Sequence, residues 1–211
     1  MSILRGILIF GEASFMRNKK ITILAECAVM VALAFVLSCA RLGKMPLGGS
    51  ITVASMLPIM LIGIKYGNAI GLGTAFVYSA TQLLQAVIDN DVFPYCETFT
   101  TLVICVLFDY LFPFTVLGLS GAFMKITKIR HAEIRAYIGI VTVVIARFHS
   151  HFVTGVAIWH QWAPDGMGKY LYSFLYNGSF LSVDFLICIT VAILMFRKTE
   201  IRKLVELDRY N

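Results

Sequence analysis

Long apolar segments repeat along most of this chain, and they constrain its fold more than any other feature of the sequence. They cover residues 21–40, 51–64, 68–88, 98–124, 136–161 and 170–196. Only 14% of the 211 residues are charged, whereas soluble domains carry about 25%. About 20 apolar helical residues are needed to cross a bilayer core. The sequence therefore predicts an all-α integral membrane protein with six transmembrane helices.

Lysine and arginine residues gather at alternate ends of these segments. With six spans, the basic residues at 17–20, 65, 125–135 and 197–203 all fall on one side of the lipid bilayer. The other side carries fewer basic residues together with four acidic ones: Asp89, Asp91, Glu97 and Asp165. Basic loops stay on the cytoplasmic side, so we expect both the N and the C terminus to be cytoplasmic. This topology explains the positive charge of the chain without a nucleic-acid partner.

The two ends of the chain differ from its centre. Residues 1–15 are mildly apolar but too short to span a bilayer, and Met16 followed by basic residues looks like a natural start. We expect residues 1–20 to be a cytoplasmic N-terminal extension, of which residues 1–15 are dispensable. Residues 21–197 are expected to form a six-helix membrane domain, and residues 198–211 a cytoplasmic tail.

Several kinds of chemistry find no support in the sequence. The five cysteines are scattered without a C-x-x-C pair, so we interpret them as reduced packing residues. His149 and His151 point about 200° apart on a helix and lack flanking ligands, so we expect no metal. A P-loop is absent from the sequence, so any ATP-driven step must be carried out by another chain. We expect neither a cofactor nor an enzymatic activity.

Aromatic and polar residues concentrate around the junction of the last two apolar segments. His151, Gly155 and Trp159 are spaced i, i+4, i+8, which predicts one helical stripe with a gap at the glycine. Tyr172 and Asn177 follow a short turn and could face the same space. This combination is typical of a pocket for a flat heteroaromatic molecule. The alternatives are an interfacial aromatic belt for the tryptophan and interhelical hydrogen bonding for Asn177.

Three charged residues lie inside apolar segments, where each needs a partner or a task. Arg147 and Asp184 lie at equal depth on consecutive helices, which predicts a buried ion pair. Asp109 is then left without an obvious protein partner and could pair with a cationic ligand; Tyr110, next to it, could supply a hydroxyl. Glu97, closer to the loop, is the competing acid.

At these positions the sequence resembles the ThiT/YuaJ family, the thiamine-specific substrate-binding subunits (S components) of energy-coupling factor (ECF) transporters. The most specific motif is His151-x3-Gly155-x3-Trp159, followed by Tyr172-Ser173 and Tyr176-Asn177. Phe108-Asp109-Tyr110 is similar to the acid–tyrosine pair of the family's fourth span. The A-x-x-x-A pattern of Ala28 and Ala32 matches the stripe by which such subunits dock. The proline that often follows the acid–tyrosine pair comes three residues later here, at Pro113.

The resemblance implies a multi-pass protein of the bacterial plasma membrane that captures thiamine at the outer face with high affinity. It implies that Asp109, Tyr110, His151, Gly155, Trp159, Tyr172 and Asn177 form the thiamine site. It also implies that Ala28 and Ala32 contact a transmembrane coupling protein (T component), and that two ABC ATPases drive uptake. We expect Trp159 to stack on a ring of thiamine and Asp109 to offset the thiazolium charge.

Three alternatives stay open from the sequence. The same architecture could serve another vitamin or a thiamine precursor such as a hydroxymethylpyrimidine. A small intramembrane enzyme could use His151 and Asp109 as acid and base, although the sequence arranges neither a nucleophile nor a metal beside them. A structural membrane subunit would bind no ligand.

Overall fold

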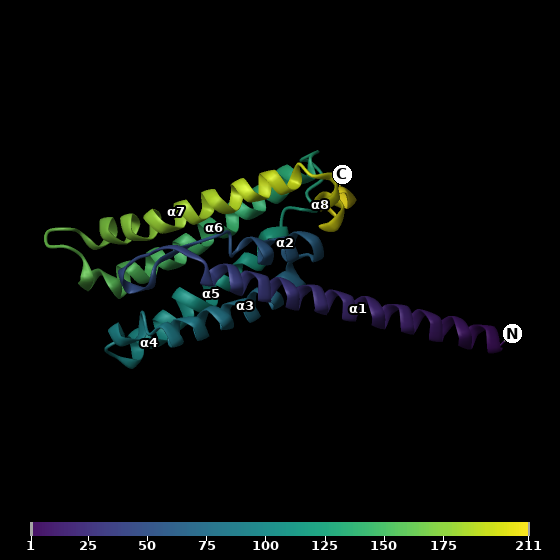
Figure 1. Ribbon diagram of the computed structural model, residues 1–211, viewed down its shortest axis with the longest axis horizontal. Coiled ribbons are helices and arrows are strands. Elements are labelled where there is room, and N and C mark those ends of the chain that lie inside the picture. Colours follow the sequence, from purple (N-terminus) through teal and green to yellow (C-terminus); the bar gives the residue numbers. More distant parts are fainter. Residues whose placement is uncertain (1, 211) are drawn as a thin grey trace.

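The computed structural model describes residues 2–210, and the side chains of residues 2–17, 208 and 210 lie outside this description. The helices run roughly side by side as a bundle (Figure 1). The four longest are α1 (Ser2–Cys39), α3 (Asn68–Asp89), α6 (Ala132–Ala157) and α7 (Lys169–Phe196). The fourth apolar segment is a continuous helical stretch in four parts: α4 (Phe99–Cys105), the π-helical η3 (Val106–Leu111), α5 (Phe112–Thr115) and the 3-10 helix η4 (Val116–Gly121).

Within the described residues, four helical stretches are long and apolar enough to cross a membrane: Asn18–Cys39, Phe99–Gly121, Ala132–Ala157 and Lys169–Phe196. The short helix α2 (Leu57–Tyr66) has 10 residues, which is about 15 Å of helix against a hydrocarbon core of about 30 Å. It is shorter than the predicted segment 51–64 because the chain before Leu57 forms a strand and a turn. The helical membrane fold is confirmed, whereas six spans stay a prediction.

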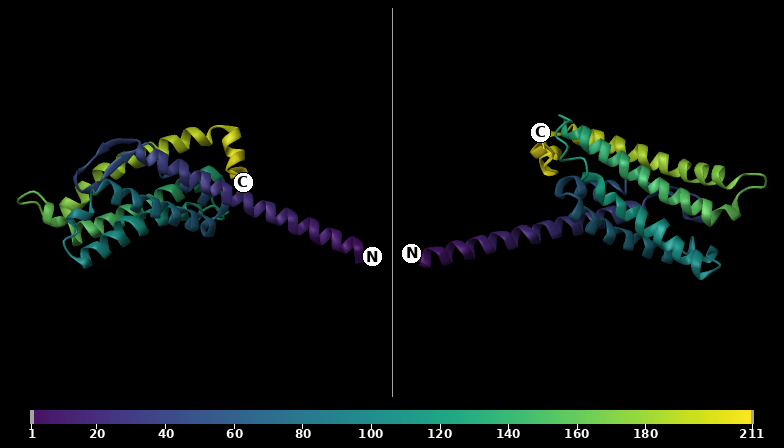
Figure 2. Two further views of the ribbon diagram at one scale, coloured as in Figure 1. Left: turned by 60° about the horizontal axis from the view of Figure 1, so that its bottom comes forward. Right: turned by 180° about the vertical axis from the view of Figure 1, so that it is seen from behind.

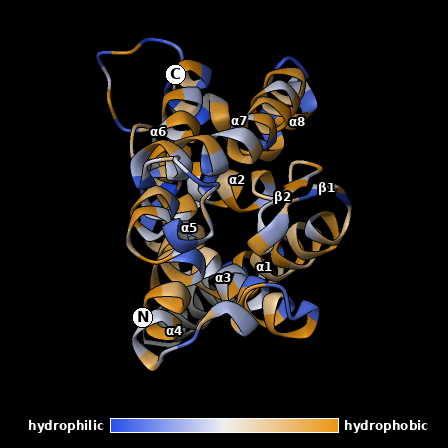
Figure 3. Ribbon diagram, turned by 90° about the vertical axis from the view of Figure 1, so that its left-hand side faces the viewer, coloured by the Kyte–Doolittle hydropathy of each residue, from blue (hydrophilic) through white to orange (hydrophobic). Residues whose placement is uncertain are grey.

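A two-stranded antiparallel hairpin, which was not predicted from the sequence, connects α1 to α2 (Figure 3). Strand β1 (Arg41–Lys44) pairs with β2 (Ser50–Thr52). The chain turns between them through Leu47 and Gly48, both with positive φ. Such a conformation costs a glycine little because it has no Cβ. In Figure 3, apolar residues recur along the helices. Large apolar side chains are exposed on α1, α3, α6 and α7.

Glycines allow the helices around α2 to pack closely. A Cβ on Gly71 would collide with the backbone of Gly118, and a Cβ on Gly121 would collide with the backbone of Gly63. Small residues that bring backbones together are a common packing device of membrane helices. The central helix α2, with every residue from Leu57 to Lys65 buried, therefore holds α3 and the fourth helical stretch in fixed relation.

The N-terminal half of α1 projects from the same end of the bundle as the C-terminal segment (Figures 1 and 2). That segment forms α8 (Thr199–Leu204) and η6 (Leu207–Tyr210) and buries Val205 and Leu207 against the core. It therefore packs on the bundle more closely than the charged tail expected from the sequence.

The predicted extension at residues 1–20 is continuous with the first span, because α1 runs through residue 20 without a break. The side chains of residues 1–17 lie outside the described part of the chain. The proposed dispensability of residues 1–15 and the boundaries at residues 20 and 197 therefore stay predictions.

Candidate functional site

The carboxylate of Asp109 accepts hydrogen bonds from three side chains. The indole Nε1 of Trp159 donates to Oδ2 at 2.8 Å, and the hydroxyl of Thr154 donates to Oδ1. The Nδ1 of His151 lies 3.0 Å from the same Oδ1. The sequence-based expectation that Asp109 lacks a protein partner is therefore wrong, because its partners come from α6 and the turn after it, which are remote in sequence.

Asp109 lies in the π-helical turn η3, which ends at Leu111, two residues before Pro113. The N–H of Phe112 donates to the carbonyl of Leu107, five residues back. Pro113 has no N–H with which to continue the pattern to Phe108, and the hydroxyl of Ser150 on α6 donates to the Phe108 carbonyl instead, at 2.5 Å. Single π-helical turns often occur at functional sites, and this one joins the Asp109 segment to α6.

The two ring nitrogens of His151 have different partners. Its Nε2 accepts from the Nε of Arg147 at 3.4 Å, so the proton of a neutral imidazole lies on Nδ1, which donates to Asp109. The ring is buried, with 9% of the residue exposed. These contacts fix both the tautomer and the orientation of the ring.

Arg147 and Asp184 form the buried ion pair that the sequence predicted. Their side chains come within 3.9 Å. The guanidinium also lies 4.4 Å from the ring centre of Phe114. Asp184 accepts hydrogen bonds from the N–H and the hydroxyl of Thr52 on β2, at 3.1 and 2.8 Å. The pair therefore also anchors the hairpin to α7.

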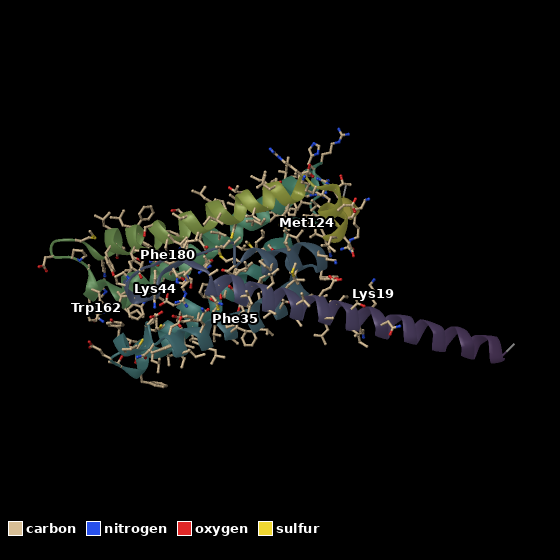
Figure 4. All side chains as sticks on the ribbon, viewed as in Figure 1. Lys19, Phe35, Lys44, Met124, Trp162 and Phe180 are labelled. Atoms are coloured by element: carbon tan, nitrogen blue, oxygen red, sulfur yellow. The ribbon has the colours of Figure 1, made fainter. Side chains whose placement is uncertain are left out.

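A cavity of about 100 Å³ lies beside Asp109, at the hairpin end of the bundle. In Figure 4, Lys44, Trp162 and Phe180 lie toward this end, and Lys19 lies toward the other. The hairpin, α3, η3, α6, η5 and α7 all contribute to its lining, which includes Arg41, Leu47, Gly48, Gly49, Gln82, Gln85, Asp89, Asp91, Asp109, Tyr110, Arg147, His151, Trp159, Tyr176, Asn177 and Phe180.

The hairpin covers this cavity and is held from two sides. On the α3 side, Arg41 pairs with Asp89, and Lys44 pairs with Asp91 at 2.6 Å. On the α7 side, the hydroxyl of Tyr176 accepts from the N–H of Gly49 at 3.1 Å and donates to the carbonyl of Pro46. The hairpin therefore lies between two helices that also line the cavity.

Five of the seven predicted site residues line the cavity: Asp109, Tyr110, His151, Trp159 and Asn177. The predicted stripe on a single helix is wrong in its geometry. Helix α6 ends at Ala157, and Trp159 begins the 3-10 helix η5 (Trp159–Trp162). Trp159 reaches Asp109 from this turn.

Gly155 and Tyr172 lie outside the lining. A Cβ on Gly155 would collide with Ser173 of α7, so this glycine permits close contact between α6 and α7 and does not open the predicted gap. Tyr172 packs against Tyr176 with ring centres 5.8 Å apart, and Tyr176 lines the cavity in its place. The competing acid Glu97 is exposed in the loop before α4 and does not line the cavity.

Asn177 combines the two roles considered for it. Its Nδ2 donates to the carbonyl of His151 at 3.1 Å, which is an interhelical hydrogen bond, and the residue also lines the cavity. The α3 and hairpin residues of the lining were not predicted from the sequence. The spacing of Gln82, Gln85 and Asp89 on one face of an apolar helix was the signal that could have revealed them.

The predicted docking residues lie on a different surface. Ala28 and Ala32 are exposed on α1 and line an apolar groove of about 760 Å³ between α1 and α3. Lys20 borders the groove, and Gly73 and Val77 form part of its α3 wall. Thus α3 contributes to both the groove and the cavity.

Comparison with known proteins identifies the family. A family model described as thiamine transporter protein (Thia_YuaJ) matches residues 24–204. The thiamine transporter ThiT of Bacillus subtilis is 31% identical over 191 residues, covering 85% of this chain and 93% of the relative. The thiamine transporter ThiT of Lacticaseibacillus paracasei is 24% identical over 175 residues, covering 77% and 80%.

A solved structure of ThiT from Listeria monocytogenes has the same fold. Its TM-score is 0.67 at 24% identity, covering 87% of this chain and 98% of that chain. The family match, over residues 24–204, extends over most of the membrane bundle and all the cavity elements. This chain therefore belongs to the thiamine transporter protein (Thia_YuaJ) family, whose members are transport proteins and not enzymes.

Proposed function

We propose that this chain captures thiamine in the cavity beside Asp109, as the substrate-binding subunit of an ECF-type importer in the bacterial plasma membrane. The observation that carries the proposal is the environment of Asp109. In the described part of the chain, no lysine or arginine forms an ion pair with this carboxylate, while Arg147 is paired with Asp184. Its hydrogen bonds to His151, Thr154 and Trp159 orient the carboxylate without a lysine or arginine to neutralise it. A cationic ligand would supply that charge, and the thiazolium of thiamine is a permanent cation.

Residues that line or adjoin the cavity have roles that suit this ligand. The indole of Trp159, held by its bond to Asp109, offers a face for stacking or for a cation–π contact of about 0.5–2 kcal/mol. His151 and Thr154 orient the carboxylate, and Tyr110 and Asn177 supply polar groups beside the rings. Gly155 and Tyr172 support the site, because they set the contact of α6 with α7 and the position of Tyr176.

The cavity must expand to hold the whole ligand. Its volume of about 100 Å³ is below the roughly 300 Å³ at the lower end of ligand pockets. Outward movement of the hairpin would provide the space, because the hairpin covers the cavity. It is held there by side-chain contacts to Asp89, Asp91 and Tyr176, which would break in that movement.

We further propose six spans with both termini in the cytoplasm. The additional spans are α3 and the region of α2 with its flanking turns. The N-terminal half of α1 and the segment α8–η6 lie at the end of the bundle opposite the hairpin (Figure 1), and the basic segment 125–135 is expected on the same side. The cavity then faces the outside, as capture for uptake requires.

The groove between α1 and α3 is the proposed docking surface for a transmembrane coupling protein. Small residues at Ala28, Ala32 and Gly73 would allow a helix of that partner to approach closely. Two partner ATPases would supply the energy, because the sequence contains no P-loop.

Tryptophan fluorescence of the purified protein tests the proposal, because Trp159 and Trp162 are the two tryptophans of the chain. Thiamine should quench the signal with a dissociation constant well below micromolar. Tighter binding of hydroxymethylpyrimidine than of thiamine would favour the precursor-binding alternative. Absence of binding by either compound, checked by calorimetry, would overturn the proposed function.

A further inference from the structure

Polar side chains follow one face of α3 where it lines the cavity. Gln82, Gln85 and Asp89 are spaced i, i+3, i+7 and therefore share a face, and all three line the cavity. Asp89 is paired with Arg41 of the hairpin. The neutral amides of Gln82 and Gln85 remain on this face of the cavity. Burying an amide without hydrogen-bond partners costs free energy.

Ser38, near the end of α1, orients both amides from behind. Its hydroxyl oxygen accepts from Nε2 of Gln82 at 3.0 Å. The same hydroxyl lies 3.0 Å from Oε1 of Gln85 and 2.7 Å from the carbonyl oxygen of Phe35, and it shares its single proton between these two acceptors. Ser38 is buried, with 3% of the residue exposed, and is absent from the cavity lining. One hydroxyl thus contacts the NH2 of Gln82 and the carbonyl oxygen of Gln85, so the two amides face it with opposite ends.

This arrangement leaves complementary groups on the two glutamines. The NH2 of Gln82 is turned toward Ser38, so its Oε1 is available as an acceptor. The Oε1 of Gln85 is turned toward Ser38, so its NH2 is available as a donor; that NH2 makes a long contact of 3.7 Å with the Cys39 sulfur. An acceptor and a donor one helical turn apart suit a neutral group that both donates and accepts.

We propose that Gln82 and Gln85 form a second, uncharged binding wall that recognises a neutral donor–acceptor group of the ligand, with Ser38 as a positioning residue that acts through them. The inference rests on the proposed function. Thiamine has two groups of this chemistry: the aminopyrimidine edge and the primary hydroxyl. The α3 wall would bind one of them, while Asp109 and Trp159 bind the cationic part.

A cycle of protein and ligand changes tests the wall. Wild type, Gln82→Leu and Gln85→Leu are each titrated with three ligands. These are thiamine, oxythiamine, in which oxygen replaces the 4-amino group, and a thiamine analogue that lacks the primary hydroxyl. Each substitution should weaken thiamine binding about fivefold to tenfold, as expected for one neutral hydrogen bond. The substitutions should cause no loss of affinity for the analogue that lacks the recognised group. The ligand for which the loss disappears therefore identifies that group.

Matched variants separate recognition from packing. Gln161→Leu changes an exposed glutamine outside the cavity and should bind all three ligands like wild type. Ser38→Ala should weaken thiamine binding to a similar degree and add nothing in the Gln82→Leu background, whereas Ser38→Thr should restore affinity by keeping the hydroxyl.

The outcomes distinguish this inference from the proposed function. If wild type fails to bind thiamine, the proposed function fails. If wild type binds but the glutamine variants lose nothing, or lose the same factor for all three ligands, the wall is overturned. A lower melting temperature in Ser38→Ala with unchanged ligand ratios would likewise assign these residues to helix packing alone.

Discussion

Trp159 donates its indole N–H to Asp109 across 50 sequence positions, at a distance of 2.8 Å. The two residues lie in the irregular elements η5 and η3, and neither is in a regular α-helix. The bond fixes the plane of the indole on the cavity wall and uses one oxygen of the acid. Aromatic face and negative charge are therefore positioned together, which is what recognition of a flat cation requires.

The two tryptophans should differ in their effect on binding. Trp159→Ala removes the lining ring and should lower thiamine affinity by more than tenfold. Trp162→Phe should change it little, because Trp162 is 46% exposed and packs edge-on against Tyr95. Calorimetry is the suitable measurement, since the substitutions alter the fluorescence signal. Equal effects of the two changes would contradict the assignment of Trp159 to the site.

Asp109→Asn should weaken thiamine binding strongly and spare a neutral pyrimidine fragment. Loss of a charge partner in a dehydrated site costs about 2–5 kcal/mol, and the neutral fragment has no charge to lose. Glu97→Gln is the matched control, because Glu97 is exposed and outside the cavity. A larger effect at Glu97 than at Asp109 would transfer the role to the loop acid.

Tyr176→Phe should speed thiamine release. The substitution removes the hydroxyl that joins α7 to the hairpin at Gly49 and Pro46 but keeps the ring. Tyr170→Phe, on the same helix but 62% exposed and outside the lining, provides the control. Stopped-flow fluorescence should show a several-fold faster dissociation for Tyr176→Phe alone. An unchanged rate would mean that the hairpin contact does not retain the ligand.

Binding and transport should separate at α1. Ala28→Trp or Ala32→Trp fills the groove between α1 and α3 and should block uptake while thiamine affinity in detergent stays near wild type. Val29→Trp is the control, because Val29 is 65% exposed and lies outside the groove. Uptake by whole cells that persists in both alanine variants would exclude this docking surface. A parallel loss of affinity would show that the alanines pack within the subunit.

Asp184→Asn should destabilise the protein more than the loss of both charges does. The single change leaves the buried guanidinium of Arg147 without its acid, at a typical cost of about 3–5 kcal/mol. Arg147→Met combined with Asp184→Asn removes both charges and should recover part of the loss. Melting temperatures in detergent measure the difference. If the double variant is less stable than Asp184→Asn, the ion-pair interpretation is wrong.

Hydropathy identified the long helices because lipid contact selects apolar composition over a whole segment. Helix α7 was expected at 170–196 and begins at Lys169. The hairpin was missed because β1 and β2 have only four and three residues. The end of α6 at Ala157 was missed as well, since Ile158 and Trp159 continue the apolar pattern and no glycine or proline marks the break.

The site was harder to predict because its contacts join remote segments. Five of its expected residues carry unusual side chains for a membrane helix, and that chemistry made them visible. Thr154 and Ser38 look ordinary, because hydroxyls in membrane helices often bond their own backbone. Their contacts to Asp109, Gln82 and Gln85 depend on how α6 and α1 are rotated, and composition does not determine rotation.

The π-helical turn at Val106–Leu111 has a consequence for the whole fourth stretch. One extra residue in a helical turn rotates everything beyond it by about 100°. A deletion there would leave the length and apolarity of the stretch almost unchanged, and it would still enter the membrane. Asp109 and the Phe108 carbonyl, however, could no longer both keep their partners on α6. Binding therefore depends on how the side chains of this segment are rotated about the helix axis, whereas insertion into the bilayer depends only on the segment's length and apolarity.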